Sequence, residues 1–287
     1  MLLADILLSK NEQMQIHAAG CLVNISALKQ WVGNVPSEDV VNACANLVAA
    51  VLDDSIPESY LVLLLRIVKN MCNAEILVPV IMLPVLRKLL VSFIATEEIS
   101  EVSACALAVI GSACRLETFL SSFVNLGAVP AALSSGNKAL TKLGFLQEHT
   151  EVETAESAKD MHLLMKALSG CLSLLYFCSL DIEMQDDLLG MGALVFWTGI
   201  MTLRSCPLNL LHVVVESLTH ISQNVSCRRK FLRSPILRQL LLLSQESETR
   251  LRNNANQVLR ALSIDKDVRR DLARLGYSGY SMKHWDV

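Results

Sequence analysis

One helical segment recurs along this chain, and its recurrence limits the folds that the chain can adopt. Asn11 can cap the first turn of a helix over residues 11–26. Five residues of that segment have the spacing of one buried helix face: Met14, Ala18, Cys21, Leu22 and Ile25. Variants of its second half return five more times. Because a helix with one apolar face cannot bury that face alone, the repetition predicts stacked units, an α-solenoid.

The intervals between the repeated helices agree with that architecture. The position of Asn24 is taken in turn by Asn70, Val109, Leu174, His220 and Ala261, which we call the register positions. The intervals are 46, 39, 65, 46 and 41 residues. Four of the five lie near the roughly 40–47 residues of helical repeats built from two or three helices. The capping residues and the apolar pattern predict helices over 11–26, 37–50, 55–72, 83–94, 99–115, 161–180, 183–191, 209–222, 228–232, 236–243, 248–263 and 267–275, and a break at Gly127 before a helix with Pro130 in its first turn.

No Pro/Gly/Ser-rich linker divides the 287 residues, so we expect one repeat domain over 1–287. Apolar residues make up 52% of the chain and aromatic residues only 5%, which suits many thin contacts between helices. We expect an exposed acidic loop at about 144–158 and an incomplete last repeat at 264–287. For the loop, a solvated insertion is favoured over a dedicated binding element.

Hydropathy and cysteine content bear on where the protein works. No apolar run reaches about 18 uninterrupted residues, so we expect no transmembrane segment. The nine cysteines are odd in number, contain no CxxC pair and lie mostly in apolar helical stretches. This pattern is typical of buried thiols in a reducing compartment and predicts a cytoplasmic or nuclear protein.

Two segments resemble the armadillo repeat family: AAGCLVNIS at 18–26 and FVNLGAVPAAL at 123–133. Units of that family have a short first helix, a second helix often introduced by Gly-Ala-Ile/Val-Pro, and a long third helix. The resemblance covers nearly the whole chain and implies an all-α, right-handed superhelix of about six armadillo-like repeats. It also implies that the third helices line a concave surface, where an asparagine at the register position binds the backbone of an extended peptide.

Only part of that peptide-binding pattern is kept here. Asn24 and Asn70 keep the asparagine, and His220 offers a different polar group, whereas the other register positions are apolar. The tryptophan that nuclear-import members place four residues earlier is missing, so we expect no import adaptor. The residues expected to contact a protein or peptide partner are His17, Asn24, Arg66, Asn70, His212, Glu216, His220, Asn254 and Gln257.

His212, Glu216 and His220 follow one another at intervals of four residues, so one helix face carries two imidazoles and a carboxylate. A metal or acid–base site would need a further ligand, and only the distant Cys227 is on offer. A polar binding surface is therefore favoured, and we expect no catalytic site, no metal site and no cofactor. The chain also lacks a Gly-rich phosphate loop and a GxSxG motif, so we expect no enzyme.

The carboxyl-terminal part is basic. Residues 228–275 contain twelve Lys/Arg and five Asp/Glu, although the whole chain has a net charge of −3. The densest basic cluster comprises Arg228, Arg229, Lys230 and Arg233. A solvated face is favoured, an acidic protein partner comes second, and nucleic acid or anionic lipid third, because few aromatic residues accompany the cluster.

The sequence therefore predicts a non-catalytic scaffold or adaptor that binds a protein or peptide on its third helices. The alternative is a regulatory armadillo region of a larger assembly that controls an enzyme or a small GTPase.

Overall fold

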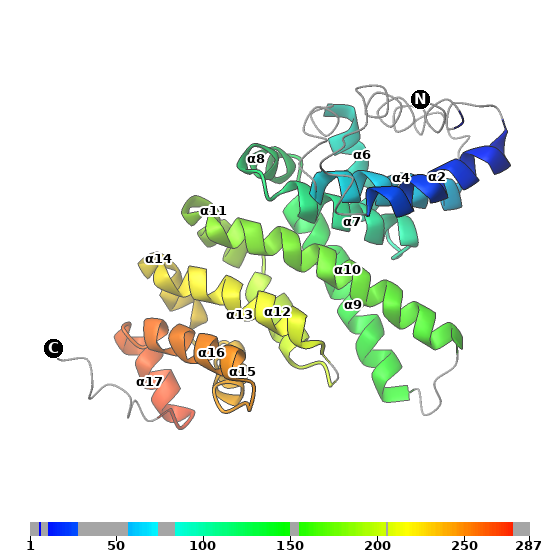
Figure 1. Cartoon of the computed structure of the whole chain (residues 1–287). Helices are drawn as coiled ribbons and strands as arrows, with labels where there is room; N and C mark the ends of the chain where they lie inside the picture. Colours follow the sequence, from blue (N-terminus) through cyan, green and yellow to red (C-terminus); the bar gives the residue numbers. More distant parts are fainter. Residues whose placement is uncertain are drawn as a thin grey trace. The chain divides into compact units, whose positions relative to one another are not determined.

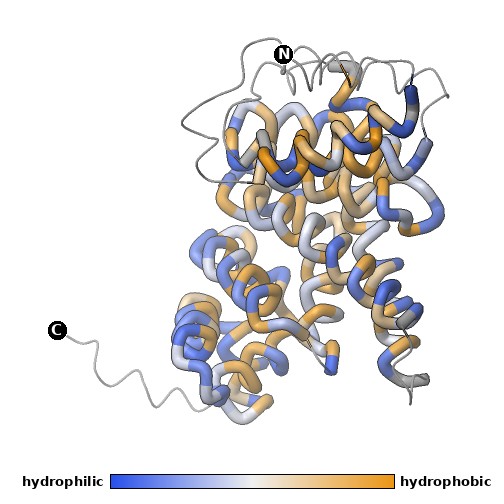
Figure 2. Tube along the Cα trace, turned by 45° about the vertical axis from the view of Figure 1, so that its right-hand side comes forward, coloured by the Kyte–Doolittle hydropathy of each residue, from blue (hydrophilic) through white to orange (hydrophobic). Residues whose placement is uncertain are grey.

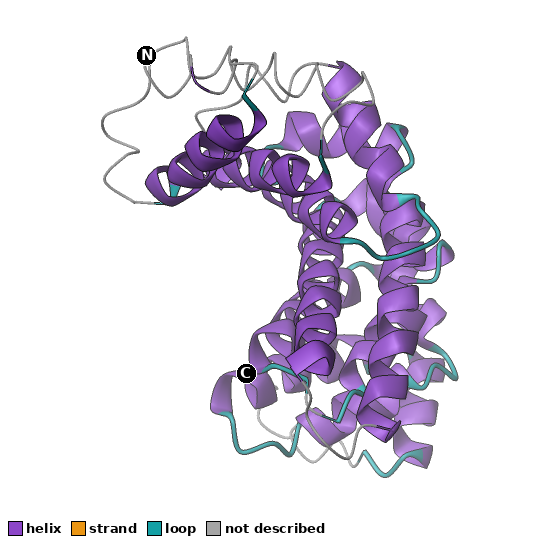
Figure 3. Cartoon of the chain, turned by 90° about the vertical axis from the view of Figure 1, so that its right-hand side faces the viewer, coloured by secondary structure: helices purple, strands orange, loops and turns teal. Residues whose placement is uncertain are grey.

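The computed structural model describes residue 6 and residues 11–27, 57–73, 84–149, 155–204 and 206–277. These ranges contain fourteen α-helices and one 3-10 helix, and no strand occurs in them (Figure 3). The expected helix over 37–50 and the end of the last repeat beyond 277 lie outside the described residues.

The chain forms two compact units, Met1–Leu174 and Leu175–Val287, whose boundary falls within one helix, α10 (Ala155–Leu180) (Figure 1). The prediction of a single domain over 1–287 stays a prediction. Besides its share of α10, the first unit contains α2 (Glu12–Ser26), α4 (Glu58–Asn73), α6 (Pro84–Ile94), α7 (Glu101–Ala113), α8 (Glu117–Asn125) and α9 (Ala128–His149). The second contains α11 (Ile182–Gly190), α12 (Ala193–Met201), α13 (Leu208–Gln223), α14 (Val225–Arg228), η3 (Arg229–Phe231), α15 (Ile236–Leu243), α16 (Thr249–Leu262) and α17 (Lys266–Arg274).

Within the described residues, the helices follow the expected order of a short first, a second and a long third helix. Hydrophobic residues (orange) and hydrophilic residues (blue) alternate along them, as helices with one buried face require (Figure 2). The third helices, which contain the register positions, are α2, α4, α7 and α10 in the first unit, and α13 and α16 in the second.

The acidic loop predicted at about 144–158 is wrong over most of its length. α9 continues to His149 and α10 begins at Ala155, which leaves only 150–154, outside the described residues. Apolar residues recur at helical spacing among the polar ones: Ala139, Leu143 and Leu146 lie on one helix face. Ala139 and Leu143 are fully buried. Burial along that face holds the segment in a helix despite its acidic composition.

The buried face of α2 also differs from the one predicted. Ala18, Ala19 and Leu22 are buried, whereas Met14 is 48% exposed and Cys21 is exposed. Helical spacing alone does not determine which residues at the edges of an apolar stripe are buried. Packing against α4 selects the side that carries Ala19, whose small side chain lets the two helices approach closely.

Short polar residues start several first helices of the second unit. Asp181, Asn224 and Asp265 precede α11, α14 and α17, and each side-chain oxygen accepts a backbone N–H from the first turn. The N–O distances to the second helical residue are 2.9, 3.1 and 2.9 Å. Because such caps satisfy otherwise unpaired donors, they let a third helix turn directly into the next repeat.

A residue with left-handed backbone follows each described first helix. It is Gly127 after α8, Gly192 after α11 and Gly276 after α17, with φ of 81°, 96° and 90°. The equivalent residue after η3 is Arg233, with φ of 57°. A side chain in this conformation costs roughly 1–2 kcal/mol, a cost that glycine avoids. The backbone N–H of Arg233 donates to Oδ2 of Asp271 at 2.9 Å, which helps to hold the turn.

α7 and α10 approach each other at two glycines. A Cβ added at Gly170 would lie 2.7 Å from Cβ and 2.8 Å from the carbonyl carbon of Leu107. A Cβ added at Gly111 would lie 2.7 Å from Cβ of Ser173. No real side chain tolerates such distances, so the two backbones can meet only where both helices carry glycine.

α10 is long and apolar enough to cross a membrane, with a mean hydropathy of 1.7 over its most apolar window. α8 and α9 would also pass as one span, but they are bent by 78° at their junction. Of this apolar window of α10, 56% is buried inside the protein. Within it, the Cys171 thiol donates a hydrogen bond to the Ala132 carbonyl oxygen at 3.2 Å. Packing within the fold thus accounts for the apolar composition of α10.

Six of the described cysteines are buried, and the described cysteines are all free thiols: Cys21, Cys72, Cys105, Cys114, Cys171, Cys178, Cys206 and Cys227. Burial raises the pKa of Cys72 and of Cys171 to about 12. Burial also raises the pKa of Cys178 to about 12, and the nearby Asp181 carboxylate adds to the shift. These thiols therefore stay protonated at neutral pH.

Replacing Gly170 with alanine should destabilise the fold by about 1–3 kcal/mol, because the new Cβ overlaps the Leu107 backbone. Urea unfolding followed by circular dichroism measures this. The matched control is Gly144→Ala in α9, where nothing lies within 4 Å of the added Cβ. That change should instead stabilise by about 0.5–1 kcal/mol through helix propensity. Equal effects of the two changes would contradict the close contact.

Iodoacetamide should alkylate Cys21 of the native protein well before Cys171 or Cys178. The thiolate is the species that reacts. Burial raises the pKa of Cys171 and Cys178, so little thiolate forms, and it also keeps the reagent away from both sulfur atoms. Mass spectrometry of peptides after timed labelling measures the rates, and labelling in urea should remove the difference. Comparable native rates would show that the α10 cysteines are not enclosed.

Candidate functional site

In the first unit, three third helices are joined by a cluster of charges. Arg66 of α4 pairs with Glu101 of α7, and Nζ of Lys166 on α10 lies 3.8 Å from the same carboxylate. Lys166 also lies 3.0 Å from Sγ of Cys105. Arg66 and Glu101 keep 43% and 44% of their side chains exposed, so the cluster lies at the surface. A pair this exposed contributes little to stability, about 0–1 kcal/mol.

In the second unit, two further pairs join α13 and α16. Nε2 of His212 lies 3.6 Å from Oε2 of Glu248, and Oε1 of Glu216 accepts from Nη2 of Arg250 at 2.6 Å. The backbone N–H of Leu251 lowers the pKa of Glu248, because this carboxylate caps the start of α16. The Arg250 N–H and the Arg250 side chain act in the same direction. The carboxylate therefore stays ionised.

His212, Glu216 and His220 do not converge on one point. His212 faces Glu248 and Glu216 faces Arg250, whereas the His220 ring meets the Tyr176 ring edge-on at 6.1 Å. Among the described residues, no group of three or more His, Cys, Asp or Glu side chains could hold a metal ion. Each of the three side chains thus has a different neighbour.

The register asparagines differ in what they offer. Nδ2 of Asn70 donates to the Val23 carbonyl at 3.3 Å and to Oγ of Ser26 at 3.0 Å, so its amide fastens α4 to the end of α2. Asn24 is exposed on α2. Asn70 therefore has a structural role, and Asn24 is the register asparagine whose side chain is exposed.

The remaining predicted contact residues divide by exposure. His17 on α2 and Gln257 on α16 are exposed, and Asn254 is half-buried. The register positions Val109 and Leu174 are fully buried. α7 packs against α4 and α6 and meets α10 at the glycines, so no polar binding surface is open at Val109.

The basic cluster predicted at 228–233 is not one surface patch. Arg228 is 9% exposed; its Nε donates to the Ser222 carbonyl at 2.9 Å and its Nη2 to the Gln223 carbonyl at 3.1 Å. These are free carbonyls at the end of α13, where a cation is favoured. An arginine a few residues beyond a helix end is the signal that could have revealed this role.

The neighbouring cations are exposed but neutralised. Arg229 pairs with Asp265 at 3.4 Å, and Lys230 pairs with the Asp186 carboxylate at 2.7 Å. Of the three exposed cations, Arg233 alone has no described carboxylate within ion-pair distance of its side chain, since Asp271 accepts its backbone N–H.

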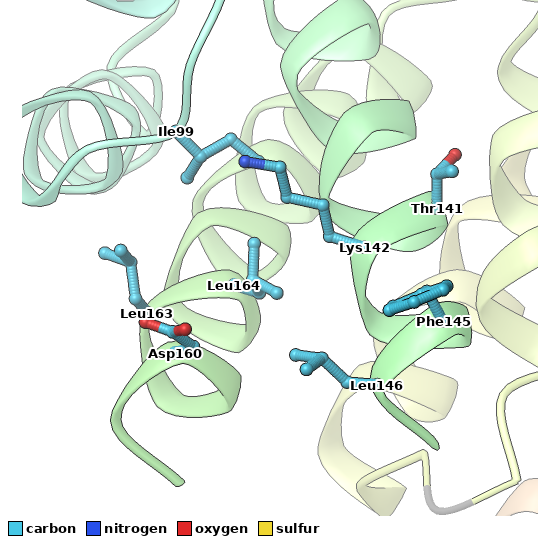
Figure 4. A pocket seen from close by; sticks show the side chains of 8 residues that line it. All are labelled: Ile99, Thr141, Lys142, Phe145, Leu146, Asp160, Leu163 and Leu164. Carbon is cyan, nitrogen blue, oxygen red and sulfur yellow. The ribbon is translucent and has the colours of Figure 1, made fainter. Parts of the chain in front are cut away.

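A pocket of about 420 Å³ lies between the end of α9 and the start of α10, within the first unit (Figure 4). Apolar side chains face it from both helices, with Lys142 reaching across toward Ile99. Asp160 lies on the opposite side. Two of its lining residues, Phe145 and Leu146, fall in the segment predicted as an acidic loop, and the helical spacing of Leu143 and Leu146 is the signal that could have revealed the helix there. The lining residues are Ile99, Thr141, Lys142, Phe145, Leu146, Asp160, Leu163 and Leu164.

Arg228→Ala should destabilise the protein by about 1.5–3 kcal/mol, because it removes two charge-assisted hydrogen bonds to the carbonyls of Ser222 and Gln223. The adjacent Arg229→Ala removes the same charge from an exposed pair and should change stability by no more than about 0.5 kcal/mol. Urea unfolding of both variants makes the comparison. Similar effects would mean that Arg228 is not a capping residue.

No protein-family model and no curated protein sequence matches the chain. Solved structures do. A designed armadillo repeat protein is similar at a TM-score of 0.67 and 16% identity, over 91% of this chain and 98% of that one. Another, in complex with the peptide (KR)4, is similar at 0.66 and 15%, with the same coverage. An engineered protein reaches 0.67 and 14%, over 92% and 98%. The chain therefore has an armadillo-like, all-α repeat fold.

Proposed function

We propose that this chain is a non-catalytic scaffold that binds a segment of a partner protein on the surface of its third helices. The observation that carries the proposal is the row of partly exposed polar residues on these helices, joined from one repeat to the next. The similar designed protein that was solved with a peptide supports this use of the fold.

The parts of this surface open to a partner are those whose polar groups are exposed and not engaged in holding helices together. Asn24 and His17 meet this condition on α2, and Gln257 meets it on α16. Side-chain amides are suited to an extended peptide, because each offers both a donor and an acceptor to the peptide backbone. Arg66, Glu216 and His212 can join in only by leaving their present partners.

The charge of this surface bears on the partner. The carboxylates that a strongly basic peptide such as (KR)4 would need are already opposed by cations: Glu101 by Arg66 and Lys166, and Glu216 by Arg250. Breaking these pairs would offset much of the attraction. We therefore propose a ligand of mixed charge, bound largely through its backbone.

The free thiols support a location in a reducing compartment, the cytosol or the nucleus. This location is a further part of the proposal.

Asn24→Arg and Gln257→Arg should each weaken partner binding by roughly tenfold or more, because a bulky cation then fills the place of the ligand backbone. The intact protein and both variants serve as baits for lysate proteins, which quantitative mass spectrometry compares. Testing the two changes separately tells which unit carries the binding residues.

The matched controls are Asn125→Arg at the end of α8 and Gln245→Arg just after α15, exposed positions outside the third helices. They add the same charge and should leave capture unchanged. The proposal fails if every captured protein is retained equally by the third-helix variants and by the controls.

A further inference from the structure

A second cleft, of about 290 Å³, lies in the second unit and away from the third helices. It is lined by the turn before α15, the start of α15 and the end of α17. Its apolar lining comes from Pro235, Leu237 and Leu275, and its polar lining is mostly arginine: Arg233, Arg238 and Arg274. Three cations and one carboxylate, Asp271, around apolar side chains leave the cleft with a net positive charge.

Two of the three arginines of this cleft have no carboxylate partner among the described residues. Arg274 shares Asp271, with Nη1 at 3.2 Å from Oδ1. Among the described residues, no carboxylate lies within ion-pair distance of the Arg233 or Arg238 side chain. Arg229 and Lys230, by contrast, each have a carboxylate of their own. An unpaired guanidinium beside apolar surface is a site for an anion that can accept two hydrogen bonds.

The backbone conformation at Arg233 also supports a role for its side chain. This residue occupies the left-handed position that the other described repeats fill with Gly127, Gly192 and Gly276. Asp271, only 14% exposed, holds this turn with one oxygen and Arg274 with the other. Strain at one repeat alone, where glycine would relieve it, is typical of a residue retained for its side chain.

We propose that this cleft binds an acidic peptide segment of a partner protein, with an apolar side chain in the cleft and neighbouring carboxylates on Arg233 and Arg238. The apolar lining favours such a segment over a free inorganic anion. No aromatic ring lines the cleft, so the base stacking by which proteins hold single-stranded nucleic acid is not available. The site shares no residue with the third-helix surface and stands independently of it.

Selection of random peptides on the intact protein tests the site directly. A phage-displayed dodecapeptide library should yield peptides that combine Asp or Glu with Leu, Ile or Phe. Fluorescence polarisation with the labelled synthetic peptides should show roughly tenfold weaker binding to Arg238→Ala and to Arg233→Gly. The second variant is decisive because glycine suits the left-handed turn: it should unfold at or above the wild-type temperature and still lose binding.

Arg269→Ala is the matched control, since Arg269 is an exposed arginine of α17 that does not line the cleft. It should bind the peptides as the wild type does. The proposal is overturned if no selected acidic peptide loses affinity in both cleft variants, or if Arg269→Ala weakens binding equally. It is also overturned if labelled oligo-dT, rather than any peptide, binds the wild type and is lost in the cleft variants.

Discussion

The close contact of α7 with α10 at Gly111 and Gly170 decides what the first unit can offer to a partner. Backbones this near leave no room for a Cβ on either side. α7 is also enclosed by α4 and α6, so its register residue, Val109, lies in the core. Of the predicted contact residues of the first unit, His17 and Asn24 are exposed on α2, and Arg66 keeps 43% of its side chain exposed where it meets Glu101.

Consecutive third helices are joined by the same kind of residue that a ligand would use. Arg66 and Glu101 link α4 to α7, and Glu216 and Arg250 link α13 to α16. Asn70, at a register position, holds α2 with its amide. Exposed ion pairs are weak enough to exchange for a ligand, whereas the Asn70 bonds lie in a packed contact and are not. A ligand of the proposed kind would therefore displace the exposed ion pairs more readily than the Asn70 bonds.

In the second unit, the four cations between Arg228 and Arg233 make different contacts, although they are close together in the sequence. Arg228 satisfies the free carbonyls at the end of α13, while Arg229 and Lys230 pair with acids of neighbouring repeats. Arg233, five residues after Arg228, is held by Asp271 in a turn that suits glycine. The four cations that are neighbours in the sequence therefore become one helix cap, two ion pairs and one side chain with no described carboxylate partner.

Periodicity and turn residues in the sequence were enough to determine the repeat order, most helix boundaries and the all-α repeat fold, because these depend on local spacing, while the armadillo likeness rested on the resemblance of two segments to that family. The same kind of spacing, at Ala139, Leu143 and Leu146, also indicated that the segment interpreted as an acidic loop is helical. Which side of α2 is buried, that Asn70 and Arg228 are structural, and that Arg233 and Arg238 share a cleft were decided only by tertiary structure. These features depend on neighbours far away in the chain, such as Val23 for Asn70 and Asp271 for Arg233, and no local pattern specifies those pairings.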